Sequence, residues 1–202
     1  MKPNLKNRYF FLRHGQNNHQ VEQGNIIYYW PDGNPPYYLT DQGKEEAKKA
    51  GEILKKEQID CILSSDLLRC RETAKIVAET IGHDKEKIIY DTRLRDLNWG
   101  AFGGKTREEY WSFYDNDHMK AFEIPAPNGE SWNQCQERAI RVLNEIEEEF
   151  ENKNILIVSH GDCLWLLEGY IKDMDNETLL KRRKEKDNEM FLKTGEVRKI
   201  NE

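Results

Sequence analysis

The sequence predicts an α/β fold with a mostly parallel central sheet. Two runs, residues 9–12 and 155–158, are apolar or aromatic throughout, which is typical of strands covered on both faces of such a sheet. Residues 61–63 and 88–90 are shorter candidates for further strands. Because helical patterns separate these runs along the chain, we expect helices to join the strands and to pack on the faces of the sheet.

Three helices are predicted between the strands. Thr40 provides an N-cap for a helix that ends at about residue 57, and a second helix begins near Asp66. Ser131 provides the N-cap for a long third helix, in which apolar side chains recur at helical spacing as far as Phe150.

Three other stretches are predicted to be loop or surface. Gly, Pro, Tyr and Asn are abundant in residues 21–38, and Pro, Asn and Gly mark residues 125–129, so both segments are predicted to be loops. The basic run at residues 181–186 is predicted to lie on a solvent-exposed face of a helix.

Length, charge and cysteine content indicate the class of protein. With 202 residues, the chain is predicted to form one domain over residues 1–202. A formal net charge of -6 argues against binding to nucleic acid or to anionic membranes. The four cysteines are scattered without a CxxC pair, which indicates reduced thiols. No apolar stretch has the length of a signal-peptide core or a membrane span, so we expect a cytoplasmic protein.

Cationic and titratable side chains follow three of the predicted strands. Arg13 and His14 come directly after the first strand, and His160 comes after the last. The strand between them leads into a helix whose first turns carry Arg69. Ligands of open parallel sheets bind beyond the carboxyl ends of the strands, and a guanidinium can hold phosphate oxygens with two N–H groups. A single His after a strand often only ends a turn, but this combination predicts an anion-binding site.

Six sequence motifs extend this interpretation over most of the chain. In order, they are LRHG at residues 12–15, LTDQG at 39–43, SSDLLRCRETA at 64–74, LRDLNWG at 94–100, GES at 129–131 and VSHG at 158–161. Each resembles an element of the histidine phosphatase superfamily, also called the phosphoglycerate mutase-like family, and the elements stand in the family's order. The resemblance implies a three-layer sandwich with a mostly parallel central sheet flanked by helices.

The resemblance also implies a role for each matching residue. His14 would be the nucleophile that forms a phosphohistidine. Arg13, Arg69 and His160 would bind the phosphoryl oxygens and offset charge in the transition state. Asp96 would be the general acid that protonates the leaving oxygen and later activates water. His14, Asp96 and His160 are thus the expected catalytic residues, and no metal or cofactor is implied.

The chain departs from the family pattern at four positions near these residues. Gln16 and Asn17 stand where the family usually has Glu-Thr, and Gln20 replaces a family Asn. The amide of Asn17 can donate a hydrogen bond, so Asn17 is expected to bind phosphate. Asp96 stands where the family usually has Glu, and its side chain is one methylene shorter. Asp162, just after the second His-Gly, is therefore an alternative acid.

Other residues beside the motifs are interpreted as structural. Arg71 and Arg95 are expected to be structural or surface arginines. The aromatic residues within 102–128 are spaced mainly as in a packed helix, although some of the rings are expected at the entrance of the site. They are Tyr110, Trp111, Phe113, Tyr114 and Phe122. The rings of the first loop are expected at the entrance as well: Tyr28, Tyr29 and Trp30.

The segment between the acid motif and the GES turn favours a phosphatase. Mutases of the family carry a long insertion there, which helps to enclose their bisphosphate, whereas residues 102–128 have the length typical of the phosphatases. An open mouth lets water reach a phosphohistidine. We therefore expect a metal-independent phosphate monoester hydrolase.

Two alternative functions remain open. One is phosphoryl transfer of the phosphoglycerate mutase type, and the other is a catalytically weak relative that binds phosphorylated ligands. The expected partner is a small phosphorylated metabolite as substrate, with no nucleic acid and no membrane, and a homodimer is left open.

Overall fold

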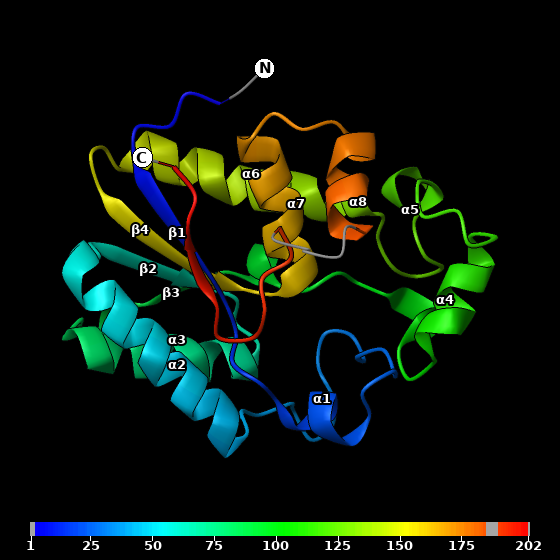
Figure 1. Cartoon of the computed structure of the whole chain (residues 1–202), viewed down its shortest axis with the longest axis horizontal. Helices are drawn as coiled ribbons and strands as arrows, with labels where there is room; N and C mark the ends of the chain where they lie inside the picture. Colours follow the sequence, from blue (N-terminus) through cyan, green and yellow to red (C-terminus); the bar gives the residue numbers. More distant parts are fainter. Residues whose placement is uncertain (1–2, 185–189, 202) are drawn as a thin grey trace.

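The computed structural model describes residues 3–184 and 190–201, and helices cover both faces of a central sheet (Figure 1). The strands of the sheet are β1 (Arg8–Arg13), β2 (Cys61–Ser64), β3 (Ile89–Tyr90), β4 (Asn154–Ser159) and β5 (Val197–Lys199). Their order is β3-β2-β4-β1-β5. β1 to β4 pair in parallel, as predicted. β5 is not among the predicted strands, and it pairs antiparallel with β1.

The helices of the described residues include the three that the sequence predicts. They are α1 (Asn18–Glu22), α2 (Asp41–Leu54), α3 (Leu68–Ile81), α4 (Arg107–Phe113), α5 (Lys120–Glu123), α6 (Trp132–Glu149), α7 (Gly161–Ile171) and α8 (Asn176–Lys184). α2, α3 and α6 correspond to the predicted helices. α4 lies in the 102–128 segment, where the aromatic spacing predicts a packed helix, and α8 contains the start of the basic run that is predicted to lie on a helix. α1, α5 and α7 are not among the predicted helices.

The predicted helix starts and loops agree with the structure except at a few residues. The hydroxyl oxygens of Thr40 and Ser131 accept hydrogen bonds from backbone N–H groups in the first turns of α2 and α6. A 3₁₀ turn after α2, Lys55–Glu57, completes the predicted span. The predicted loop at 21–38 is wrong for its first two residues, which end α1 because Asn17 caps that helix.

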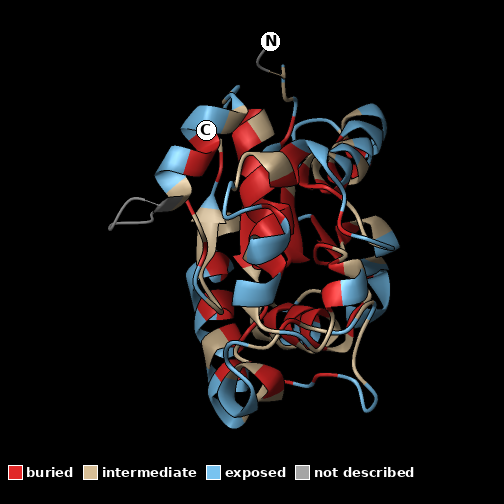
Figure 2. Cartoon of the chain, turned by 90° about the vertical axis from the view of Figure 1, so that its right-hand side faces the viewer, coloured by how far each residue is buried: buried red, intermediate tan, exposed pale blue. Residues whose placement is uncertain are grey.

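Side chains of the sheet alternate between two apolar clusters. Tyr9 and Phe11 of β1 belong to the cluster that contains residues of α6 and α7. Phe10 and Leu12 belong to the cluster with α2 and α3. Both faces of the strands are therefore covered, which explains their continuous apolar sequences. Figure 2 shows the buried residues in the interior and the exposed residues on the outer faces of the helices.

The parallel register brings the two motif histidines to one edge of the sheet. Arg13, the last residue of β1, pairs with Ser159, the last residue of β4. His14 and His160 therefore leave neighbouring strands at the same level, and the N–H of His14 donates to the carbonyl of Ser159 over 3.0 Å. β2 pairs with β4 on its other side and leads toward α3, which carries Arg69.

Candidate active site

The imidazole of His14 is oriented by the backbone. Its Nδ1 lies 2.8 Å from the carbonyl oxygen of Gly15, and because a carbonyl only accepts hydrogen bonds, Nδ1 carries the proton. Nε2 therefore keeps its lone pair and can act as a nucleophile. Burial, followed by the charges of Arg69 and Arg13, holds the pKa of His14 well below its usual value. The ring is therefore neutral near pH 7.

Two glycines explain why the LRHG and LTDQG motifs occur together. A Cβ on Gly15 would lie 2.3 Å from the carbonyl oxygen of Gly43, and a Cβ on Gly43 would lie 2.0 Å from that of Gln16. The backbone after His14 thus packs directly on the first turn of α2. The N–H of Gly15 also donates to Thr73 Oγ1 over 3.1 Å, which ties the same turn to α3.

Two arginines and two histidines meet at this edge of the sheet. The ring centroids of His14 and His160 are 5.2 Å apart. The Nε atoms of Arg13 and Arg69 are buried and have no hydrogen-bond partner among the described residues. A buried N–H without a partner costs free energy, so both guanidinium groups are suited to a bound oxyanion. Helix α7 begins directly after His160, so the free N–H groups of its first turn lie at the same edge.

His160 is fixed by polar side chains from the residue after β2 and from α3. Its Nε2 lies 3.0 Å from Ser65 Oγ and 3.3 Å from Cys70 Sγ. Its Nδ1 lies 3.9 Å from Asp96 Oδ2. Burial, together with the charge of Arg69, lowers the pKa of His160 well below its usual value. Both histidines are thus uncharged, and the positive charge of the site comes from the arginines.

Asp96 has the environment expected of a proton donor. Its Oδ2 is 3.9 Å from Nη2 of Arg69, and the residue is only 9% exposed. Burial raises its pKa first, and the negative charge of Asp162 raises it further, against the opposing effect of Arg69. The alternative acid, Asp162, is 2.6 Å from Nη1 of Arg183. Asp162 is thus held by Arg183, whereas Asp96 lies beside Arg69 and His160, so the geometry favours Asp96 as the acid.

The loop that carries Asp96 is held by an arginine that the sequence analysis does not single out. The guanidinium of Arg138 donates to three carbonyl oxygens, those of Arg93 at 2.6 Å, Arg95 at 2.8 Å and Asp96 at 2.7 Å. Arg138 is bound in turn by Glu130 of the GES motif at 2.6 Å. The GES turn therefore acts on the site through α6, by positioning the acid loop.

Asn17 caps α1 and also binds Tyr28. Its Oδ1 accepts the N–H of Gln20 over 3.0 Å, and Gln20 Oε1 accepts the N–H of Asn17 over 3.1 Å, so both residues form the cap of α1. Its Nδ2 donates to the hydroxyl of Tyr28 over 3.0 Å. One further amide hydrogen remains for a phosphate oxygen. The departure at Gln20 is thus explained by the capping of α1.

The loop after α1 covers Arg69. Asp32 Oδ1 lies 3.3 Å from Nη1 of Arg69. The ring centroid of Tyr28 is 4.7 Å from the guanidinium carbon, and that of Tyr37 is 5.9 Å away. Of the loop rings expected at the entrance, Tyr28 is therefore in contact with a site residue, whereas Tyr29 is 55% exposed.

The residues interpreted as structural have structural contacts, with one correction. Arg95 forms an ion pair with Asp66 at 2.6 Å, and Arg71 lies over the ring of Tyr90 at 4.1 Å. Within the basic run, residues 181 and 182 are exposed as predicted. The prediction is wrong for Arg183, whose guanidinium packs among aromatic rings because Asp162 binds it. Residues 185 and 186 of the run lie outside the described residues.

The aromatic residues of the 102–128 segment are mainly packing residues. Tyr110, Tyr114 and Phe122 are each 1% exposed, and Phe113 is 43% exposed. The ring of Trp111 stacks on another side chain at a centroid distance of 3.7 Å. This agrees with the interpretation of a packed helix, here α4 and the residues that follow it.

Residues 190–196, which lead into β5, contact the site from the C-terminal part of the chain. The guanidinium of Arg13 donates through Nη1 to the carbonyl of Leu192 over 2.9 Å, and its carbon lies 5.3 Å from the ring centroid of Phe191. The N–H of Gly195 points to the carbonyl oxygens of Arg13 and His14 at 3.1 and 3.2 Å. A Cβ on Gly161 would lie 2.5 Å from the ring of Phe191. This segment therefore fixes Arg13 from the C-terminal side.

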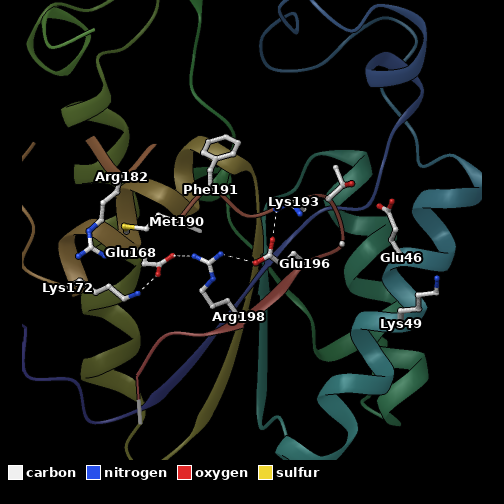
Figure 3. Close-up of a pocket in the computed structure, with 12 residues that line it drawn as sticks. Glu46, Lys49, Glu168, Lys172, Arg182, Met190, Phe191, Lys193, Glu196 and Arg198 are labelled. Carbon is white, nitrogen blue, oxygen red and sulfur yellow. Dashed lines mark hydrogen bonds and ion pairs between the residues drawn. The ribbon is translucent and has the colours of Figure 1, made fainter. Parts of the chain in front are cut away.

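A pocket of about 790 Å³ adjoins the same segment (Figure 3). It lies between α2, α7 and the chain that leads into β5, and none of the predicted site residues lines it. Its floor contains Glu168, which is fully buried and binds Lys172 at 2.5 Å and Arg198 at 3.0 Å. The pocket shares Phe191 and Gly195 with the segment that contacts Arg13, but neither motif histidine lines it.

The described residues contain neither a candidate metal cluster nor a membrane-spanning helix. Among residues 3–184 and 190–201, no group of three or more His, Cys, Asp and Glu side chains could hold a metal ion. No helix in the described part of the chain is long and apolar enough to cross a membrane.

The fold defines an α/β protein in which two His and two Arg side chains meet at one edge of the sheet. The family model of the histidine phosphatase superfamily (branch 1) matches residues 9–189, and the chain belongs to this family.

Known relatives include both mutases and phosphatases. A 2,3-bisphosphoglycerate-dependent phosphoglycerate mutase of Parvibaculum lavamentivorans is 27% identical over 184 residues, which are 87% of this chain and 85% of that protein. The solved structure of YhfR from Bacillus stearothermophilus is 28% identical, has a TM-score of 0.73, and covers 95% of this chain and 89% of its own. A mycobacterial glucosyl-3-phosphoglycerate phosphatase, in a structure with VO3, is 26% identical, with a TM-score of 0.68 and 85% of each chain covered.

Sequence reasoning misses several residues that build the site. Three of them lie in the motif at residues 64–74, close in sequence to Arg69: Ser65, Cys70 and Thr73. That closeness is the sequence signal that could have found them. Asp32 stands in a Pro- and Gly-rich loop that the sequence predicts correctly as a loop, but without a link to the site. No sequence signal singles out Arg138.

Proposed function

We propose that the protein is a phosphate monoester hydrolase that acts through a phosphohistidine on His14. The observation that carries this proposal is that an oriented, neutral His14 and a buried Asp96 of raised pKa both lie beside His160. One group is prepared to attack phosphorus and the other to give up a proton.

In the first step, Nε2 of His14 attacks the phosphorus atom and the ester P–O bond breaks. Arg13, Arg69 and His160 bind the nonbridging oxygens, and Asn17 adds an amide N–H. Asp96 gives its proton to the departing oxygen, so that the alcohol leaves uncharged. Two fixed guanidinium groups in a buried site stabilise the charge that the phosphoryl group carries through the transition state.

In the second step, a water molecule attacks the phosphohistidine. Asp96, now a carboxylate, takes a proton from that water, and the P–N bond breaks to release inorganic phosphate. His14 regains its lone pair on Nε2 and Asp96 regains its proton, so the cycle closes. The hydrogen bond from Nδ1 of His14 to Gly15 keeps the same tautomer throughout.

The course of the 102–128 segment supports hydrolysis over mutase chemistry. Its helices α4 and α5 lie at the far side of the molecule from β2 and β3 (Figure 1), and its rings pack among themselves and on α6 and α7. A mutase keeps water away from its phosphohistidine, and a short segment engaged in packing favours access of water. The curated mutase relatives make phosphoryl transfer the second candidate.

The first experiment measures phosphate release from para-nitrophenyl phosphate and traps the enzyme with acid or base during turnover. We expect an acid-labile, base-stable phosphoenzyme, and we expect His14→Ala to lower the rate by about four decades. His83→Ala, which changes a half-buried histidine outside the candidate site, is the matched control. Normal turnover by His14→Ala would overturn the assignment of His14 as the nucleophile. Conversion of 3-phosphoglycerate in the presence of 2,3-bisphosphoglycerate, without net phosphate release, would favour the mutase.

A further inference from the structure

An acidic residue of the loop after α1 shares Arg69 with the proposed acid. Asp32 Oδ1 lies 3.3 Å from Nη1 of Arg69, and Asp96 Oδ2 lies 3.9 Å from Nη2 of the same guanidinium. A guanidinium is a small planar group, so the two carboxyl groups flank it within a few ångströms. Because Asp96 marks the side from which the leaving group departs, Asp32 lies at that side too.

The loop itself holds the carboxylate of Asp32 in place. Oδ1 accepts the N–H of Gly33 over 3.0 Å and the N–H of Tyr37 over 3.2 Å, in addition to the contact with Arg69. The side chain is 14% exposed. Asp32 is therefore a fixed negative charge in a partly buried position.

The residues of the loop after α1 that lie over Arg69 form the mouth of the site, and beside Asp32 they are aromatic and uncharged. The rings of Tyr28 and Tyr37 lie over Arg69, and His19 stacks on Tyr28 with centroids 4.2 Å apart. Burial, followed by the charge of Arg69, lowers the pKa of His19 to about 4, so this imidazole is neutral near pH 7. A leaving group would meet ring faces and hydroxyl groups here.

Two arginines beside Trp30 of the loop are already engaged in ion pairs. Arg95 pairs with Asp66 at 2.6 Å, and Arg138 pairs with Glu130 at 2.6 Å. The guanidinium carbons of both arginines lie near the ring of Trp30, at 5.9 and 6.0 Å from its centroid. Within the described residues, the loop thus offers a leaving group a carboxylate and aromatic rings, while these two cations are bound elsewhere.

We propose that Asp32 is a specificity residue, which restricts the site to phosphate monoesters of uncharged alcohols. This inference rests on the proposed function. A carboxylate or a second phosphate on the leaving group would meet the like charge of Asp32 in a site where water screens poorly. A neutral polyol or ring can instead donate a hydroxyl to Asp32 and pack on Tyr28. Repulsion of the wrong ligand is a direct means of discrimination.

The test uses two substrates that differ only at this group. Glycerol 3-phosphate has a CH2OH where 3-phosphoglycerate has a carboxylate. We expect wild-type kcat/KM to favour glycerol 3-phosphate by about tenfold or more, and Asp32→Asn to reduce that ratio by about tenfold. An Asn keeps the Oδ1 acceptor for Gly33 and Tyr37 and removes only the charge. Added NaCl should reduce the ratio in the wild type and leave it flat in Asp32→Asn, because salt screens a repulsion between charges.

The controls separate charge from loop structure and from catalysis. Asp115→Asn removes a charge from a side chain that is 81% exposed and should keep the wild-type ratio. An unchanged ratio in Asp32→Asn, with phosphate still released, would overturn this inference and leave the proposed function standing. Absence of phosphate release from both substrates and from para-nitrophenyl phosphate would overturn the proposed function. The affinities of the two phosphates, measured by calorimetry, would then test Asp32 without turnover, and equal affinities would overturn its role.

Discussion

The two ends of the candidate site are built from different kinds of contact. At the phosphate end, His14 and His160 follow paired strands, and backbone contacts such as that of Gly15 with Gly43 fix their positions. At the mouth, a loop without regular structure carries Asp32 and its tyrosines, and side-chain contacts with Arg69 hold them.

This difference separates chemistry from selection of the substrate. Residues at strand ends move little unless the sheet itself changes, so the phosphate end can keep one geometry while the loop changes. Substitutions at the phosphate end should therefore affect turnover of every substrate. Substitutions in the mouth should change the relation between substrates.

After that of His14→Ala, the largest effect expected in this comparison is that of Asp96→Asn. The change keeps the shape of the side chain and removes the proton, so hydrolysis of an alkyl phosphate should fall by roughly two to four decades. An activated aryl phosphate should lose less in the first step, because its leaving group needs no proton. Rates with both substrates, under single-turnover conditions, measure the difference.

Asp162→Asn is the matched variant for Asp96→Asn. It removes the partner of Arg183 and one of the causes that raise the pKa of Asp96, so we expect a smaller loss without the selectivity between leaving groups. An equal loss for alkyl and aryl substrates in Asp96→Asn, with the selective defect in Asp162→Asn, would move the acid role to Asp162.

The pH dependence of kcat tests the same end of the site. Asp96 must be protonated for the first step, and its raised pKa keeps it so to a higher pH than an ordinary carboxyl. His14 must be neutral, and its lowered pKa keeps it so below pH 6.5. Turnover of an alkyl phosphate should therefore decrease as the pH rises, and the decrease should begin at a higher pH than an ordinary carboxyl would give.

The variant Asp96→Asn should lack the loss of turnover toward alkaline pH. A decrease of wild-type kcat on acidification, centred at the ordinary histidine value of 6.5, would contradict the neutral His14. Stability should be followed over the same range by urea denaturation, so that unfolding is not mistaken for a change in turnover.

The phosphate end could be predicted from the sequence because its chemistry demands particular residue types at strand ends. His14 and His160 are such residues, Arg69 stands in the helix that follows a strand, and continuous apolar runs locate the strands. Arg138 could not be predicted, because it acts through the carbonyl oxygens of a loop about 40 residues earlier in the chain, and these are present whatever the side chains. Asp32 could not be assigned because nothing local determines which arginine it meets.

The helices and strands that the prediction lacks have physical reasons as well. α7 is buried almost throughout, so it has no polar face to reveal a helical period. β5 is three residues long and only partly buried, so its sequence shows no apolar run. Arg183 was interpreted as solvent-exposed because its run is basic, and only the tertiary structure brings Asp162 to it.

The smallest expected effect is that of a substitution in residues 190–196, the segment before β5. Like the loop with Asp32, this segment lies outside the motifs, but it contacts Arg13 at the phosphate end. The ring of Phe191 lies against the guanidinium of Arg13 and the backbone of Gly161. Phe191→Ala removes the ring beside the guanidinium of Arg13 but leaves its hydrogen bond to the carbonyl oxygen of Leu192. Because Arg13 is then held less firmly, orthovanadate should bind about threefold to tenfold more weakly. The ratio between glycerol 3-phosphate and 3-phosphoglycerate should stay at its wild-type value, because Asp32 is untouched. Phe113→Ala, at a 43% exposed ring, is the control. A shifted substrate ratio with unchanged vanadate affinity would assign Phe191 to the mouth instead, and would show that the segment before β5 selects substrates as the loop does.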